Sequence, residues 1–288
     1  MVIEIQPIGK SFAARMLGID AAAGIDEAAR ERIEQALAEY GVVVFPGQVL
    51  NDDQQQRFIS GFGPPVTTSL KELKSAKDTN PYFFDVGNLD DDGSRISDKS
   101  PRGMYLLANQ LWHTDGSQIQ PPIRLTALSA RALPSNPPPT EYADMRAAYD
   151  ALGEGMRRRI EGLVAEHSIM YSRSKIGMKE EDFSEETRNS RKPVQHALVR
   201  TNARTGRKSL YLASHASHIV GLPMAEGRSL IEELMAFSTQ PEFVYSHRWS
   251  PHDLVMWDDS WTMHRATPFE SKEQRLLRWC GVRELDAV

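Results

Sequence analysis

Three residues in the sequence have types and spacing that suit a metal ion. His113 and Asp115 form a His-x-Asp motif within Leu-Trp-His-Thr-Asp-Gly-Ser. On an extended backbone, side chains two residues apart project to the same side, so this imidazole and carboxylate can hold one ion together. His264, much later in the chain, offers a third ligand. Two histidines and a carboxylate leave coordination positions open, as in non-haem Fe(II) oxygenases.

Zinc hydrolases use the same ligand types, so the triad alone does not identify the metal. Arg275 separates the two chemistries, because a buried arginine facing into a barrel is costly unless an anion meets it. Its planar guanidinium suits a carboxylate bound through two hydrogen bonds, and Thr140 could donate its hydroxyl to the same group. A dicarboxylate cosubstrate would supply that anion, which leaves the zinc hydrolase as the less favoured alternative.

Two further histidines and two aspartates near His264 are not expected to bind the metal. His215 and His218 have no carboxylate in their segment, which favours hydrogen-bonded polar residues over a second metal site. Asp258 and Asp259 precede His264 closely and are typical of a turn, although either could hydrogen-bond to a ligand histidine.

Composition excludes several classes of protein. The 288 residues carry 34 Lys and Arg against 39 Asp and Glu, a net charge of −5, which argues against a nucleic-acid partner. No apolar run approaches the roughly 20 residues that span a bilayer, and the N-terminus lacks a secretory apolar segment. The single cysteine cannot form an intramolecular disulfide. We therefore expect a cytoplasmic protein without a membrane or nucleic-acid partner.

The elements that must position these residues begin as α/β and become β-rich. Asp26 is expected to cap a helix over 26–40 that ends at Gly41, and Asn51 a helix to about residue 62; strand 42–45 lies between them. Further helices are expected at 144–152, 155–164 and 223–237. Strands are expected at 106–112, 123–133, 167–171, 195–201, 209–213, 242–249, 253–257 and 275–284. This order predicts an α+β fold with a jelly roll (a cupin-like double-stranded β-helix) covered by helices.

No linker divides the sequence, so a single domain over 1–288 is expected. The segment 65–103 lacks hydrophobic periodicity and is rich in Lys, Asp, Ser and Gly. Long irregular segments of this kind are typically disordered or act as lids over a site, and we expect a lid here.

With these features in hand, the sequence resembles the taurine dioxygenase and 2,4-dichlorophenoxyacetate dioxygenase (TauD/TfdA) family of Fe(II)/2-oxoglutarate-dependent dioxygenases. The resemblance covers nearly the whole chain and is more similar to the aryloxyalkanoate branch than to the sulfonate branch. The blocks that carry it are VVVFPGQ (42–48), NQLWHTD (109–115), TEYADMRAAYDAL (140–152), SLYLASHASHI (209–219), EFVYSHRW (242–249) and DLVMWDDSWTMHRA (253–266).

The resemblance implies roles for particular residues. His113, Asp115 and His264 would bind Fe(II), while Arg275 and Thr140 would hold the distal carboxylate of 2-oxoglutarate. O2 would take the last open coordination position of the iron.

At the substrate-binding residues, this chain matches the family at some positions and departs from it at another. Asn109 matches a position near cosubstrate and substrate, and Lys71 matches a basic residue that grips the substrate acid. Relatives often have a second arginine four residues after Arg275, where this chain has Trp279. An indole there favours stacking on a ring or packing on an apolar part of the substrate. On a regular strand Arg278 would point to the opposite face, so it could not replace that arginine.

The expected reaction is hydroxylation of a small organic acid with release of succinate and CO2. An aryloxyalkanoate substrate would undergo ether cleavage to a phenol and an oxoacid. The alternative within the same family is a dioxygenase acting on an alkylsulfonate or a sulfate ester. Relatives assemble into dimers or larger species, so the resemblance also implies a homo-oligomer.

Overall fold

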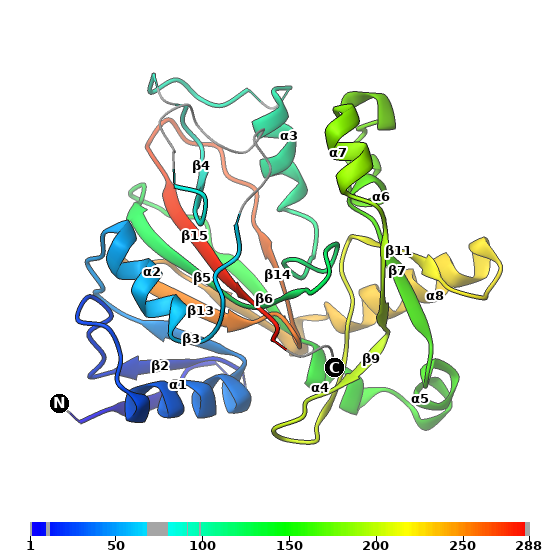
Figure 1. Cartoon of the computed structure of the whole chain (residues 1–288), viewed down its shortest axis with the longest axis horizontal. Coiled ribbons are helices and arrows are strands. Elements are labelled where there is room, and N and C mark those ends of the chain that lie inside the picture. The colour runs from blue at the N-terminus through cyan, green and yellow to red at the C-terminus, as the bar shows by residue number, and fades with distance from the viewer. Residues whose placement is uncertain (1, 10–11, 68–79, 91, 98, 286–288) are drawn as a thin grey trace.

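The computed structural model describes residues 2–9, 12–67, 80–90, 92–97 and 99–285. They form a mixed α/β structure in which two main sheets lie face to face and helices cover the outside (Figure 1). Among these residues, no helix is long and apolar enough to cross a bilayer.

The larger sheet has seven strands. Its neighbouring strands are antiparallel except for the parallel pair β2 and β3. In spatial order the strands are β1 (Glu4–Pro7), β2 (Ala14–Leu17), β3 (Val42–Phe45), β13 (Leu254–Asp258), β5 (Ile123–Ala132), β15 (Leu276–Arg283) and β4 (Phe84–Gly87).

Three smaller sheets complete the β-structure. The one that faces the large sheet consists of β12 (Val244–His247), β6 (Thr140–Asp144) and β14 (Thr262–Ala266). The other two consist of β11 (Ala216–Ile219), β7 (Val164–His167) and β8 (Val194–Ala197), and of β10 (Lys208–Leu210) with β9 (Val199–Thr201).

Helices connect and cover these sheets. They are α1 (Glu27–Tyr40), α2 (Asp52–Ser60), α3 (Pro101–Ala108), α4 (Met145–Ala151), α5 (Glu154–Ile160), α6 (Ile169–Ser174), α7 (Glu185–Ser190) and α8 (Met224–Ser238), with 3-10 turns η2 (Glu180–Asp182) and η3 (Pro241–Phe243).

Local signals set the two N-terminal helices, as predicted. The Asp26 side chain accepts a hydrogen bond from the backbone of Ala29, and Asn51 forms a reciprocal capping box with Gln54. Gly41 ends α1 with φ at 73°, and a side chain there would collide with the Phe12 ring 2.5 Å away. The chain therefore turns directly from α1 into β3.

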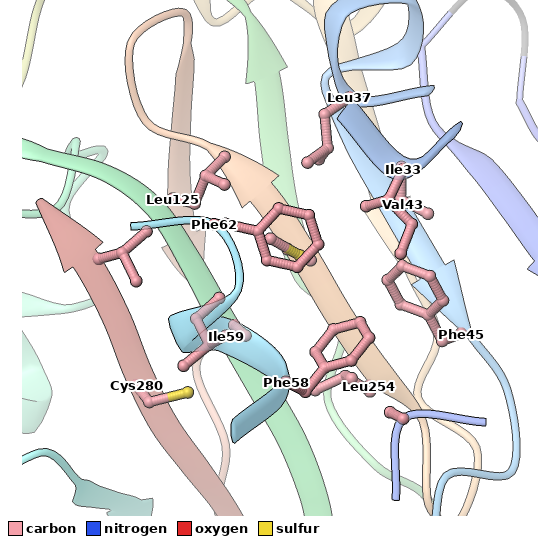
Figure 2. Close-up of a cluster of buried hydrophobic side chains, with 14 of the residues drawn as sticks. Ile33, Leu37, Val43, Phe45, Phe58, Ile59, Phe62, Leu125, Leu254 and Cys280 are labelled. Atoms are coloured by element: carbon pink, nitrogen blue, oxygen red, sulfur yellow. The ribbon is translucent and has the colours of Figure 1, made fainter. Parts of the chain in front are cut away.

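The alternation of side chains along each strand gives the large sheet two distinct faces. Its outer face packs against α1 and α2 in a dry cluster, whose members shown in Figure 2 are Ile33, Leu37, Val43, Phe45, Phe58, Ile59, Phe62, Leu125, Leu254 and Cys280. The inner face packs against the β12–β6–β14 sheet, where Tyr142 contacts Trp257 with ring centroids 5.3 Å apart. The candidate site lies on this inner side.

Two of the predicted strands are wrong. Of the residues expected as a strand at 106–112, the first three end α3 and the other four lie in the turn that follows. The start of α3 is fixed by Ser100, which accepts from the backbone of Gly103, and by Pro101. In 167–171, β7 ends at His167 and Ser168 caps α6. Short apolar runs fit either periodicity, and here the capping residues decide.

The segment 65–103 also contains structure that its pattern did not predict. Phe84–Gly87 forms β4, which pairs with β15 at the edge of the large sheet. Part of the segment lies outside the described residues, so its proposed lid function is neither confirmed nor excluded by the structure.

Candidate metal site and adjoining cavities

The structure brings His113, Asp115 and His264 together, with one donor atom from each lying within 4.8 Å of the others. This is the one such cluster among the residues that the structure describes. His264 stands in the middle of β14, and His113 pairs with it in an isolated antiparallel bridge. Two backbone hydrogen bonds of 3.0 and 2.8 Å join these histidines. Asp115 follows in a turn rather than in the strand that the motif suggested.

Both imidazoles point their Nε2 atom toward the carboxylate of Asp115. His113 donates from Nδ1 to the carbonyl of Leu111 at 2.7 Å, which leaves Nε2 unprotonated and 3.6 Å from Asp115 Oδ1. His264 Nε2 lies 3.9 Å from Asp115 Oδ2. Burial lowers the pKa of His113. Burial also holds the pKa of His264 well below its usual value, and the nearby His113 lowers it further. Neutral imidazole is the form that binds a metal.

Several groups fix the orientation of Asp115. The indole Nε1 of Trp279 donates to Asp115 Oδ2 at 2.8 Å. The hydroxyl of Thr126 lies 3.3 Å from the same oxygen and donates to Asp259 Oδ2 at 2.6 Å. The backbone N–H of Asp115 donates to Asp259 Oδ1 at 3.0 Å. Asp259 also accepts from the indole of Trp257 at 3.1 Å. Asp259 therefore links the turn that contains Asp115 to the end of β13.

Sequence reasoning missed this function of Asp259, which was expected as a turn residue or as the partner of a ligand histidine. Burial and the nearby Asp115 raise the pKa of Asp259 well above its usual value. An aspartate directly after the apolar strand Leu254–Asp258 was the available signal, because buried carboxylates need hydrogen-bond donors.

Trp279 lies in the site, with a contact that the sequence did not suggest. Its ring stacks on Phe84, with centroids 4.5 Å apart and planes 23° apart, and its N–H is used by Asp115. As predicted, Arg278 points to the other face, where it forms ion pairs of 2.7 Å with Asp52 and 2.8 Å with Asp85.

A narrow cavity of about 30 Å³ adjoins the three candidate ligands; we call it the Arg275 cavity. It is lined by these ligands together with Phe84, Asn109, Thr140, Arg275, Leu277 and Trp279. Sequence reasoning predicted that Arg275 and Thr140 would lie together near the metal ligands, and the structure places both in this cavity.

Arg275 is only 7% exposed, and none of the described residues pairs a carboxylate with it. Its Nε atom is buried without a hydrogen-bond partner. Burial lowers the pKa of Arg275 to about 10, so the group is still charged at neutral pH. The hydroxyl of Thr140 accepts from the indole of Trp249 at 3.0 Å and keeps its own hydrogen to donate. The cavity therefore offers a cation and a donor without an anion.

A second, smaller cavity of about 20 Å³ meets the first at Tyr105, Asn109, His113 and Asp115; we call it the Arg173 cavity. Its other polar lining comes from Gln118, Arg173, Ser214 and His215. Asn109 is the C-cap of α3 and lines both cavities. Its contact with cosubstrate and substrate stays a prediction.

Two other predicted residues have different outcomes. His215 lies close to the site, with Nδ1 hydrogen-bonded to the hydroxyl of Ser117 at 3.0 Å, as expected of a satisfied polar residue. Lys71, the predicted contact to the substrate acid, lies outside the described residues.

Comparisons with known proteins agree with this geometry. The chain is 40% identical over 279 residues to the alpha-ketoglutarate-dependent 2,4-dichlorophenoxyacetate dioxygenase of Cupriavidus pinatubonensis, with 96% of each chain covered. It is 35% identical over 280 residues to the (S)-phenoxypropionate/alpha-ketoglutarate-dioxygenase of Sphingobium herbicidovorans, with 95% of this chain and 92% of that relative covered.

Among solved structures, the crystal structure of AAD-2 in complex with Mn(II) and N-oxalylglycine superposes with a TM-score of 0.89. It is 38% identical in sequence, and the match covers 100% of this chain and 98% of that one. The family described as taurine catabolism dioxygenase TauD, TfdA family, matches residues 4–280. The chain therefore belongs to the TauD/TfdA family of dioxygenases.

Proposed function

We propose that the protein is an Fe(II)- and 2-oxoglutarate-dependent dioxygenase that hydroxylates an aryloxyalkanoate, with cleavage of the ether to a phenol and an oxoacid. The observation that carries the proposal is the position of Arg275. A buried, charged guanidinium without a carboxylate partner lines the same cavity as two histidines and an aspartate. Hydrolysis at a metal does not require such a cation, whereas a dicarboxylate cosubstrate would pair with it.

The donor set fits Fe(II). His113, Asp115 and His264 would supply two neutral nitrogens and one carboxylate oxygen, a set that leaves positions open for a cosubstrate and O2. The orphaned Nε of Arg275 and the donor hydroxyl of Thr140 fit a carboxylate of 2-oxoglutarate. These residues are the ones that we propose hold the metal and the cosubstrate.

When bound, Fe(II) and 2-oxoglutarate supply the oxidising chemistry, in which O2 is consumed, the keto acid becomes succinate and CO2, and the substrate gains a hydroxyl. Arg275 and Thr140 orient the cosubstrate from its far end. Trp279 and Asp259 hold Asp115 in place through its carboxylate and its backbone N–H. Phe84 and Leu277 add apolar walls that exclude water from the cavity.

The substrate class rests on the relatives, whose names specify 2,4-dichlorophenoxyacetate and (S)-phenoxypropionate. A carbon that carries both the new hydroxyl and an aryloxy group is a hemiacetal, and its collapse releases the phenol. An alkylsulfonate or sulfate ester remains the alternative substrate within the family.

We infer further that the seven-stranded sheet and the β12–β6–β14 sheet are the two halves of a jelly roll. Their face-to-face packing, with the candidate ligands on the inner side, supports this interpretation. A single domain over 1–288, a lid within 65–103 and a homo-oligomer also remain predictions. Limited proteolysis with and without ligands would test the lid, and light scattering would test the oligomer.

The direct test is to incubate the protein with Fe(II), 2-oxoglutarate, O2 and phenoxyacetate, and to measure succinate and phenol. We expect both products in equal amounts and neither under nitrogen. Phenol release without O2 or 2-oxoglutarate would contradict the proposal and indicate hydrolysis. Faster turnover of an aliphatic sulfonate or sulfate ester in a parallel assay would move the substrate to the alternative class.

Arg275→Ala tests the cosubstrate site. Removing one partner of a buried charge pair costs about 2–5 kcal/mol, so the 2-oxoglutarate concentration for half-maximal rate should rise by at least about 30-fold. Arg265→Ala serves as a control, since Arg265 is paired with Glu141 at 2.7 Å and does not line the cavity. An equal effect of both variants would remove Arg275 from the proposed site.

A further inference from the structure

We propose that Arg173 binds the acid group of the substrate, a carboxylate, in the cavity next to the metal ligands. The proposal rests on the dioxygenase function and makes its substrate site specific. Arg173 lies near the end of α6, two residues after the stretch 167–171 that was expected as a strand.

The first observation is that some of the buried arginines have a carboxylate partner and others do not. Five arginines among the described residues are at least nine-tenths buried, and three of them have a carboxylate within hydrogen-bond distance. The paired ones are Arg146 with Asp144 at 2.9 Å, Arg200 with Glu284 at 2.7 Å and Arg278 with Asp52 at 2.7 Å. Arg173 and Arg275 have none in the described part of the chain, and these two line the cavities beside His113 and Asp115.

The second observation is how little the surroundings of Arg173 satisfy it. The side chain is 6% exposed; its guanidinium lies 4.6 Å from the centroid of the Tyr105 ring, and Nη1 is 3.4 Å from the hydroxyl of Ser172. A guanidinium has five N–H donors, and the described partners of Arg173 are side-chain hydroxyl groups, with no carboxylate to balance its charge. Burial lowers the pKa of Arg173, and the hydrogen bond with Tyr105 offsets only part of this effect.

The third observation concerns the cavity itself. Arg173 shares it with the ligands His113 and Asp115, and with Gln118, whose Oε1 is buried without a partner. Arg173 has no carboxylate within hydrogen-bond distance among the described residues, and a carboxylate that enters this cavity would accept from its guanidinium. Gln118 Oε1 is an acceptor and would need a donor instead.

The neighbouring strand β15 supplies no other donor for the substrate acid. The N–H of Trp279 is used by Asp115, and Arg278 points to the opposite face, where it pairs with Asp52 and Asp85. Arg275 lies in the other cavity with Thr140, where the cosubstrate is proposed to bind. Among the described residues, Arg173 is therefore the buried arginine that remains for the substrate.

The geometry also fits a carboxylate near the carbon to be hydroxylated. Both cavities meet at the candidate metal ligands, so a substrate held by Arg173 has its acid next to the reaction centre. In an aryloxyalkanoate the ether-bearing carbon is directly attached to the carboxylate. The planar guanidinium matches this group through two parallel hydrogen bonds.

The test is anaerobic calorimetry with protein loaded with Mn(II) and N-oxalylglycine, using phenoxyacetate and its neutral analogue phenoxyacetamide. We expect wild-type protein to bind the acid at least about 30-fold more tightly than the amide, and Arg173→Met to lose this preference. Arg173→Lys should restore part of it, because the charge returns without the planar geometry. Lys175→Met is the matched control, since Lys175 is a nearby cation outside the cavity.

The outcomes separate a substrate contact from a structural one. If Arg173 served only to hold α3 against α6 through Tyr105, Arg173→Met would weaken acid and amide equally, and that result would overturn the proposal. Unchanged discrimination in Arg173→Met, or tighter binding of benzylsulfonate than of phenoxyacetate by the wild type, would overturn it too. Failure of the dioxygenase function would differ, because wild-type protein would then consume no 2-oxoglutarate with any substrate.

Discussion

Trp279 and Cys280 are neighbours on β15, but their side chains lie on opposite faces of the large sheet. Trp279 points inward and donates to the Asp115 carboxylate. Cys280 points outward into the cluster beneath α1 and α2, where the amide of Gln55 lies 3.2 Å from its sulfur (Figure 2). Both side chains are buried.

The comparison shows that the residues that stabilise the fold and the residues of the candidate site lie on opposite faces of the large sheet. The outer face is filled by aliphatic and aromatic side chains, whose burial stabilises the folded state. Charged groups lie on or next to the inner face, and some of them, such as Arg275, would be paired with an opposite charge only when a ligand binds. Substitutions on the inner side should therefore reduce activity, and those on the outer side should reduce stability.

The largest effect is expected from His264→Ala on the inner side. It removes one of three candidate ligands, so Fe(II)-dependent succinate formation should fall below detection. The melting temperature should stay at or above the wild-type value, because a buried imidazole with an unpaired Nδ1 is lost. Activity assays and calorimetry on one preparation would check this. Retained turnover would remove His264 from the site.

Phe58→Ala should show the opposite behaviour. Phe58 is fully buried in the outer cluster, with its ring 5.6 Å from Phe45 and 5.7 Å from Phe62. The cavity left behind should cost about 3–5 kcal/mol of unfolding free energy, measured by urea denaturation. Val49→Ala, at an exposed position, is the control. A fall in turnover per folded molecule would show that the two faces are coupled.

Trp279→Phe should give the smallest effect and the sharpest comparison. Phenylalanine keeps the stacking on Phe84 but lacks the N–H that Asp115 accepts, so metal affinity should fall by about 10- to 100-fold. Titration with Co(II) would measure it. Cys280→Ala, one residue further on, should leave metal affinity unchanged and lower stability slightly. Equal metal affinities for wild type and Trp279→Phe would mean that the indole only packs.

Much of the candidate site could be predicted because it depends on residue type and spacing. His113, Asp115, His264, Thr140 and Arg275 were all expected, and the structure brings them together. The helix caps were also predictable, since a cap is a contact between residues three apart.

What could not be predicted depends on contacts between distant segments. Neither the burial of Arg173 nor the hydrogen bond from Asp115 to Asp259 leaves a local pattern, because their partners are far away in the sequence. The strand β4 was missed for the same reason, since its pairing partner is β15. Helix α3 was taken for a strand because its short apolar run suits both periods.

The bridge between His113 and His264 has one further consequence. Two backbone hydrogen bonds set the spacing of these imidazoles before any ion arrives, whereas the carboxylate comes from a turn. The spacing of the two imidazoles is therefore set by the backbone, whereas the place of the third ligand depends on the contacts of Asp115 with Trp279 and Asp259. An ion of slightly different radius would be accommodated only if those contacts adjust.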